Sequence, residues 1–185
     1  MPTPPSPKTR DAPAAALTLD TLNRMEHADF TRALGGIFEG SPWVAERAWP
    51  ARPFGTVDGL HDAMVAVVGR AAPDQRIRLL SAHPDLAGKA ARAGTMSASS
   101  VAEQASAGLD RLGDEEYERF SRLNAAYRDK FGFPFIIAVR RHDAAGILAA
   151  FERRLGHTAA QEVEAALAQV FDITRTRLDG LVSAP

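Results

Sequence analysis

His83 is the residue of this sequence best placed for acid or base chemistry. It follows the apolar pair Leu79-Leu80 and precedes Pro84, which keeps the backbone before it out of the helical region. A restrained imidazole beside apolar residues suits proton transfer, because only histidine titrates near neutral pH without help. The alternative is a helix-end histidine that merely bonds a backbone carbonyl, and position alone favours that alternative.

Ser100 and Glu103 have the spacing of a capping box, in which each side chain bonds the other residue's backbone N–H. This structural role is the better interpretation of Glu103. The same helix start would also present free N–H groups that could hold the carbonyl or carboxylate oxygens of a ligand. The amide of Gln104 would add a donor and an acceptor, so the sequence leaves both roles open.

Arg140 stands at the end of a run of mostly apolar residues. A guanidinium that emerges at the edge of a buried segment can grip a carboxylate with two hydrogen bonds. A structural ion pair is the alternative. Because Arg141 follows directly, the sequence does not decide which of the two arginines faces inward.

The other common kinds of site are missing from the sequence. The chain of 185 residues has no cysteine, which excludes disulfides, thiolate nucleophiles and cysteine-ligated metal sites. No two of its five histidines have the i, i+4 spacing of a zinc-binding helix, and neither a glycine-rich phosphate loop nor a G-x-S-x-G elbow occurs. The usual metal-site, nucleotide-binding and serine-hydrolase interpretations therefore fail, and a metal-dependent hydrolase lacks its clustered ligands.

The elements that must position these residues are predicted to be helices. Capping residues recur along the chain and predict a single all-α domain of about eight helices over residues 17–185. The expected helix starts lie at or next to Leu17, Asp29, Ser41, Thr56, Asp74, Ser100, Asp114, Asp143 and Thr158. The helix from Asp114 is expected to be the longest, and Gly132 to end it. The proline-rich residues 1–16 predict a disordered lead-in.

Residues 133–139 form the one apolar run that periodicity alone would assign to a buried strand. No second run of comparable strength is present to pair with it, and an unpaired strand cannot satisfy its backbone groups. We therefore predict an extended or short helical segment inside a helical domain.

Composition limits the partners. Hydrophobic residues make up 45% of the chain, and no apolar stretch reaches the length of about 18 residues that a membrane span needs. The formal net charge of -1 lacks the excess of basic residues typical of nucleic-acid or anionic-membrane binding, so the expected ligand is a small molecule. No secretory signal is apparent, which predicts a cytoplasmic protein. A non-catalytic helical binding module is the competing interpretation.

Three motifs in order resemble one enzyme family. They are Ser-Ala-His83-Pro84-Asp-Leu-Ala-Gly-Lys, then Ser100-Val-Ala-Glu103-Gln104, then Lys-Phe-Gly-Phe-Pro-Phe135-Ile-Ile-Ala-Val-Arg140. With an Asn124-x-x-Tyr127 pair and a late Arg154-Leu155 pair, they are similar to the 2-oxo-4-hydroxy-4-carboxy-5-ureidoimidazoline (OHCU) decarboxylases of urate degradation. The resemblance covers roughly residues 17–180.

The resemblance implies an all-helical homodimer that decarboxylates OHCU to (S)-allantoin without a metal or an organic cofactor. It implies that His83 is the catalytic acid or base, with Glu103 and Arg140 as polar members of the site. The substrate contacts that it implies are Pro84, Ser100, Gln104, Phe135, Ile136, Ile137, Ala138 and Val139. The chain lacks the peroxisomal tail of many eukaryotic members, which fits a bacterial cytoplasmic enzyme.

Overall fold

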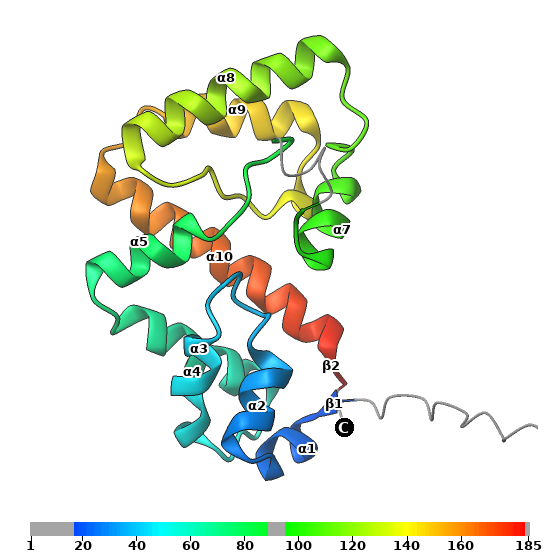
Figure 1. Cartoon of the computed structure of the whole chain (residues 1–185), viewed down its shortest axis with the longest axis vertical. Helices are drawn as coiled ribbons and strands as arrows, with labels where there is room; N and C mark the ends of the chain where they lie inside the picture. The colour runs from blue at the N-terminus through cyan, green and yellow to red at the C-terminus, as the bar shows by residue number, and fades with distance from the viewer. Residues whose placement is uncertain (1–16, 89–94, 184–185) are drawn as a thin grey trace, which may run out of the picture.

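The fold is all-α, as predicted, and it is described here from a computed structural model for residues 17–88 and 95–183 (Figure 1). The expected disordered lead-in at 1–16 lies outside the described residues. Nine α-helices fall within the described ranges, and they are α1 Leu19–Arg24, α2 His27–Leu34, α3 Trp43–Ala48, α4 Val57–Gly69, α5 Pro73–Ser81, α7 Ala98–Ser106, α8 Asp114–Phe131, α9 Ala144–Arg154 and α10 Ala159–Leu181. Two short 3-10 helices are η1 Trp49–Ala51 and η2 Val139–Arg141.

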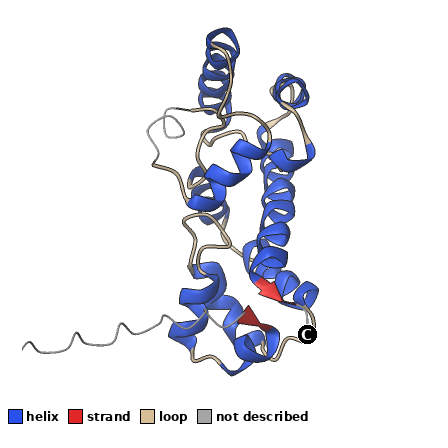
Figure 2. Cartoon of the chain, turned by 90° about the vertical axis from the view of Figure 1, so that its right-hand side faces the viewer, coloured by secondary structure: helices blue, strands red, loops and turns tan. Residues whose placement is uncertain are grey.

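Helix α10 connects the two ends of the molecule. It contacts α4, α5 and α8, and it runs from the end that holds α8 and α9 to the end that holds α1 to α4 (Figure 1). At the latter end, the two-residue strands β1 Leu17–Thr18 and β2 Val182–Ser183 pair in parallel (Figure 2). Within the described residues, no helix is both long and apolar enough to cross a membrane.

Most helix boundaries follow from local capping. Thr56 and Asp143 accept the backbone N–H three residues ahead, at 3.0 and 2.8 Å. Thr158, an expected helix start, forms a capping box with Gln161 at the start of α10. Gly132 ends α8 with a φ of 78°, a left-handed conformation that glycine adopts without strain.

Three local predictions are wrong. Leu17 and Thr18 form a strand and do not start the first helix. They pair with Val182 and Ser183, which lie so far along the sequence that a local pattern cannot reveal the pairing. Asp29 stands in the first turn of α2, whose cap position is Glu26. The longest helix is α10, with 23 residues against 18 for α8.

The apolar run at 133–139 is buried and neither strand nor α-helix over most of its length, as predicted; its last residue, Val139, begins η2. The Phe135 ring stacks on Phe151 of α9 at 3.8 Å between centroids, and Tyr127 of α8 packs edge-on against both rings. These contacts fix the run against α8 and α9, so one side of it can line a cavity.

Candidate active site

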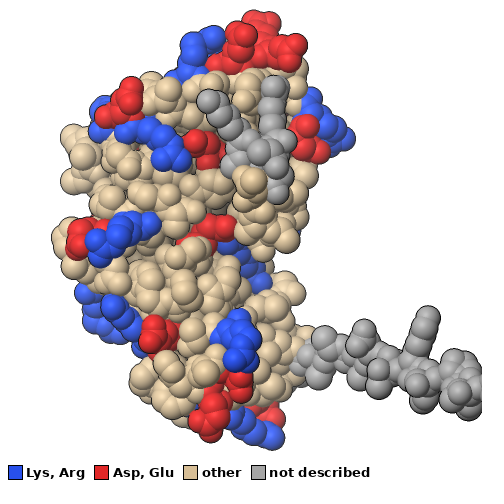
Figure 3. All heavy atoms as spheres, viewed as in Figure 1, with Lys and Arg blue, Asp and Glu red and all other residues tan. Residues whose placement is uncertain are grey.

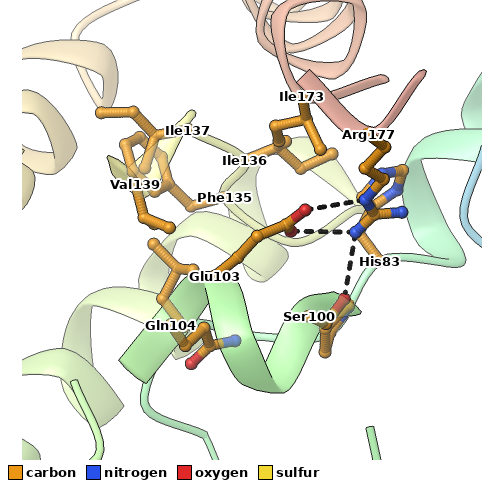
Figure 4. Close-up of a pocket in the computed structure, with 12 residues that line it drawn as sticks. His83, Ser100, Glu103, Gln104, Phe135, Ile136, Ile137, Val139, Ile173 and Arg177 are labelled. Carbon is orange, nitrogen blue, oxygen red and sulfur yellow. Dashed lines mark hydrogen bonds and ion pairs between the residues drawn. The ribbon is translucent and has the colours of Figure 1, made fainter. Parts of the chain in front are cut away.

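A small cavity of about 30 Å³ lies where the end of α5, the helix α7, the apolar run and α10 meet (Figure 4). This volume has room for no more than a few water molecules. Its lining residues are His83, Pro84, Leu86, Ser100, Glu103, Gln104, Phe135, Ile136, Ile137, Val139, Ile173 and Arg177. Most of the lining is apolar, and the polar side chains come from three separate parts of the sequence.

His83 is held as a neutral base. Its side chain is buried, and Nδ1 lies 3.1 Å from the carbonyl oxygen of Leu79, which can only accept. Nδ1 therefore carries the proton, and Nε2 presents its lone pair. Among the described residues, this buried Nε2 has no hydrogen-bond partner. Burial lowers the pKa of His83, so the ring is neutral at pH 7.

The predicted capping box at Ser100 is wrong, and the reason matters for the site. Helix α7 begins three residues earlier, with Ser97 as its cap; the Ser97 hydroxyl accepts the Ser100 N–H at 3.2 Å. Glu103 is therefore not needed at the helix start. Its carboxylate instead accepts hydrogen bonds from Arg177 of α10.

Gln104 fixes the loop that follows Pro84. The buried Gln104 amide accepts the N–H of Ala87 at 2.9 Å and donates to the carbonyl of Asp85 at 3.2 Å. The loop and α7 are thus held together on one side of the cavity. Because both ends of this amide bond the protein backbone, its first role is to shape the cavity wall.

Arg177 supplies the guanidinium group that lines the cavity. Its Nε and Nη2 donate to the two oxygens of Glu103 at 2.8 and 2.9 Å (Figure 4). Its Nη1 donates to Glu39 at 2.9 Å. Burial acts to lower the pKa of Arg177, but the bonds and charges of Glu103 and Glu39 outweigh it and raise the pKa. Arg177 is therefore charged at every pH at which the protein is folded.

The sequence-predicted site residues fall into two groups. Nine of them line the cavity, namely His83, Pro84, Ser100, Glu103, Gln104, Phe135, Ile136, Ile137 and Val139. Ala138 and Arg140 do not. They line a neighbouring groove that also borders Glu103, and the Arg140 side chain is exposed. Arg141, the alternative, forms an ion pair with Asp172 at 3.1 Å.

The sequence reasoning missed Arg177 and Glu39. Arg177 lies four residues after Ile173 and seven after Val170, so it falls on the buried face of α10. A charge on an apolar helix face was the signal that could have found it. Glu39 lies in the turn between α2 and α3, and nothing in its local sequence distinguishes it from an exposed acid.

No group of three or more histidine and acidic residues that could hold a metal ion occurs within residues 17–88 and 95–183. On the face drawn in Figure 3, acidic and basic side chains are interspersed. The site's own charged groups are the Arg177 cation and the two carboxylates that bind it.

Comparisons with known proteins agree on one family. A family model described as OHCU decarboxylase matches residues 23–179. The chain is 46% identical over 162 residues to a 2-oxo-4-hydroxy-4-carboxy-5-ureidoimidazoline decarboxylase of Haloferax volcanii, covering 88% of this chain and 94% of that protein. It is 36% identical to a mouse (Mus musculus) protein of the same name, covering 88% and 92%.

Two solved structures have similar folds. A crystal structure of (S)-allantoin synthase matches with a TM-score of 0.72 and 37% identity over 90% of this chain, which spans 54% of that longer chain. A crystal structure of OHCU decarboxylase in the presence of (S)-allantoin matches with a TM-score of 0.65 over 85% of this chain and 98% of that chain. At 20% identity, the second match speaks to the fold alone.

Proposed function

Because this chain belongs to the OHCU decarboxylase family, we propose that it decarboxylates OHCU to (S)-allantoin in urate degradation, without a metal or an organic cofactor. One observation carries the catalytic proposal. The buried Nε2 of His83, unpartnered among the described residues, lines a cavity that also contains Arg177 and Glu103. A neutral base, a fixed cation and a carboxylate in one mostly apolar cavity suit the loss of CO₂ from an anionic substrate.

The substrate supplies its own electron sink. One ring carbon carries both a carboxylate and a hydroxyl beside a conjugated C=N bond. When the bond to the carboxylate breaks, CO₂ leaves and the electron pair flows into this C=N system. The hydroxyl loses its proton and becomes a carbonyl. The nitrogen of the former C=N bond gains a proton, and the neighbouring carbon gains a proton on one face, so one proton in all is taken up as CO₂ leaves. The protein therefore has to orient the carboxylate out of the ring plane, stabilise the developing charge and control these proton transfers.

His83 is the proposed base for the hydroxyl proton. Its neutral tautomer, with Nδ1–H bonded to the Leu79 carbonyl, leaves Nε2 free to accept. The resulting imidazolium can return a proton to the ring or stabilise the charge that develops. General acid–base assistance of this kind contributes about 10²–10⁴-fold to a rate.

Arg177 is proposed to bind the substrate carboxylate. The sequence offered Arg140 as a candidate for this role, but its side chain lines the neighbouring groove, whereas the guanidinium of Arg177 lines the cavity with His83. A bidentate arginine–carboxylate pair gives direction as well as energy, because the two N–H···O bonds are parallel. Ser100, Gln104 and the apolar run from Phe135 to Val139 are proposed to contact the ring and the ureido group.

Kinetics of the two arginine variants should separate these roles. We expect Arg177→Ala to lower kcat/KM by about 100-fold or more, because a buried bidentate pair with the carboxylate is lost. Arg140→Ala should stay within about fivefold of wild type, as expected for an exposed cation at the rim. A larger loss of kcat/KM in Arg140→Ala than in Arg177→Ala would mean that Arg140 binds the carboxylate.

A single assay tests the function itself. Freshly generated OHCU is mixed with the protein, and the optical sign of the allantoin formed is followed by circular dichroism. Wild type should give (S)-allantoin faster than the spontaneous decay, which yields a racemate. His83→Asn should lower kcat by about 100-fold or more with the circular dichroism of the fold unchanged. The control is His142→Asn, which changes an exposed histidine. Activity of His83→Asn within about threefold of wild type would remove His83 from the mechanism.

Two further parts of the proposal concern the whole protein. We propose a homodimer, which the family resemblance implies, and a cytoplasmic location, which the sequence analysis predicts. Light scattering on the purified protein should give twice the mass of one chain. A monomer with full activity would contradict the dimer as the working form.

A further inference from the structure

We propose that Glu39 is a positioning residue: it holds Arg177 in the cavity while Glu103 gives up its bonds to Arg177 in favour of the substrate carboxylate. This inference rests on the proposed function. It concerns a carboxylate that lies in the turn between α2 and α3 and lines none of the cavities described above.

Every N–H of the Arg177 guanidinium already has an acceptor. Glu103 takes the Nε and one Nη2 hydrogen, and Glu39 takes one Nη1 hydrogen. The Ile37 carbonyl lies 3.2 Å from Nη1, and the Ser100 hydroxyl lies 3.3 Å from Nη2. Because arginine has five N–H donors, none is left for a second carboxylate. A substrate anion can therefore bind Arg177 only by displacing one of these acceptors.

Glu103 is the acceptor that can leave. Its carboxylate lines the cavity and two neighbouring grooves, and its hydrogen-bond partner among the described residues is Arg177. It occupies the Nε–Nη2 edge, where two parallel N–H groups match a carboxylate. A substrate carboxylate offers the same two oxygens to the same edge, so one bidentate pair replaces another. The cavity of about 30 Å³ is too small for a substituted ring unless a side chain moves.

Glu39 is the acceptor that stays. Its carboxylate also accepts the Ser100 hydroxyl at 3.0 Å, and Ser100 in turn accepts from Arg177, which closes a ring of three side chains. The side chains of Arg177 and Glu39 are 8% and 12% exposed, so water competes little for these bonds. With Glu103 displaced, Glu39, Ser100 and the Ile37 carbonyl still hold the guanidinium in place.

Positioning and simple electrostatics predict opposite results when Glu39 is removed. If Glu39 were only a nearby negative charge, its loss would strengthen the attraction of Arg177 for an anion and lower KM. If Glu39 positions Arg177, its loss lets the guanidinium move with Glu103 and stay bonded to it, so Arg177 binds the substrate carboxylate less well. The sign of the effect therefore separates the two roles.

The experiment compares Glu39→Ala with Glu46→Ala, which removes an exposed acid of α3. Glu39→Ala should lower kcat/KM for OHCU by about tenfold or more, while the Kd of allantoin, a neutral product without a carboxylate, stays within about threefold. Glu46→Ala should match wild type. An unchanged or increased kcat/KM in Glu39→Ala, or equal weakening of allantoin, would overturn the proposal. If Glu39→Ala fails to fold, Glu39→Gln takes its place, with an expected loss of about threefold or more.

A second readout does not depend on activity. In ¹⁵N NMR spectra, the Nε–H signal of Arg177 is identified by its absence in Arg177→Lys. It should stay sharp in Glu103→Ala, where Glu39 still holds the guanidinium, and should broaden when Glu39→Ala is added to Glu103→Ala. A sharp, unshifted signal in the double variant would overturn the proposal. A wild type that leaves OHCU to decay at its spontaneous rate would overturn the proposed function instead, and the NMR comparison would still decide on Glu39.

Discussion

The protonation state of His83 follows from its two nitrogen atoms having different surroundings. Nδ1 is tied to the Leu79 carbonyl, and Nε2 is buried in the cavity. Burial is the largest influence on its pKa and lowers it; the charge of Arg177 lowers it further, while the Leu79 bond and the charge of Glu39 act in the opposite direction. The imidazole is thus kept as a base through the neutral range.

This direction predicts the pH dependence of the reaction. A base must be deprotonated to act, and a pKa below the ordinary value of 6.5 keeps His83 deprotonated above that pH. We expect kcat/KM, which reports the free enzyme, to be flat from about pH 8 down to about pH 6.5 and to fall only at lower pH. The measurement is the initial rate of allantoin formation across this range. An acid limb centred above pH 7 would contradict the lowered pKa.

At the scale of elements, the apolar run depends on a buried ion pair next to it. Arg154 of α9 donates to the Ile136 carbonyl at 2.7 Å, and its guanidinium stacks over the Phe135 ring at 4.5 Å. Glu162 of α10, fully buried, accepts from Arg154 at 2.9 Å and from the Tyr127 hydroxyl. The pair therefore links α8, α9 and α10 to a backbone segment that lines the cavity.

Removing the acidic partner should destabilise the fold. Glu162→Gln would leave the buried Arg154 charge uncompensated, so we expect a loss of about 3 kcal/mol or more in the free energy of unfolding. Urea denaturation followed by circular dichroism measures this loss. The control is Glu164→Gln on the same helix, where the side chain is 73% exposed and the expected change is within about 0.5 kcal/mol. Equal stabilities of the two variants would mean that the buried pair contributes no net stability.

At the scale of the whole molecule, the site depends on contacts between distant parts of the chain. Glu39 and Arg177 are 138 positions apart, and α10 brings the second to the first. The short β1–β2 pair joins the two ends of the described chain on the same side of the molecule as α1 (Figure 1). Substrate binding is therefore expected to stabilise the fold as a unit, because the proposed substrate contacts come from the end of α5, α7, the apolar run and α10 together.

Chelation tests the proposal that the enzyme works without a metal. The proposed electron flow ends in the substrate ring, and the charged groups that assist it are Arg177 and Glu103. Dialysis against EDTA should therefore leave kcat unchanged within the error of the assay. A loss of activity that added Zn²⁺ or Mg²⁺ restores would contradict this part of the proposal.

Local signals in the chain suffice for the helical class and for most helix starts. Position alone favoured a structural role for His83, and its proposed catalytic role came from the family resemblance. Caps such as Thr56 and Asp143 act over three residues, and the run at 133–139 reveals by its lack of a partner that it is not a strand. These features involve neighbouring residues, so they can be recognised without knowing the fold. The predicted site residues came mainly from the family resemblance, and nine of them line one cavity because the fold brings their three motifs together.

The partners of Glu103 could be settled only by the folded chain. The capping spacing favoured Ser100 as the partner of Glu103, yet the residue that caps α7 is Ser97. The Glu103 carboxylate instead bonds Arg177, 74 positions away. Likewise, the guanidinium that lines the cavity belongs to Arg177 of α10 and not to Arg140. An ion pair between distant residues forms only where the faces of their helices meet. The packing of the whole core determines which faces meet, and a short stretch of sequence carries no information on that packing.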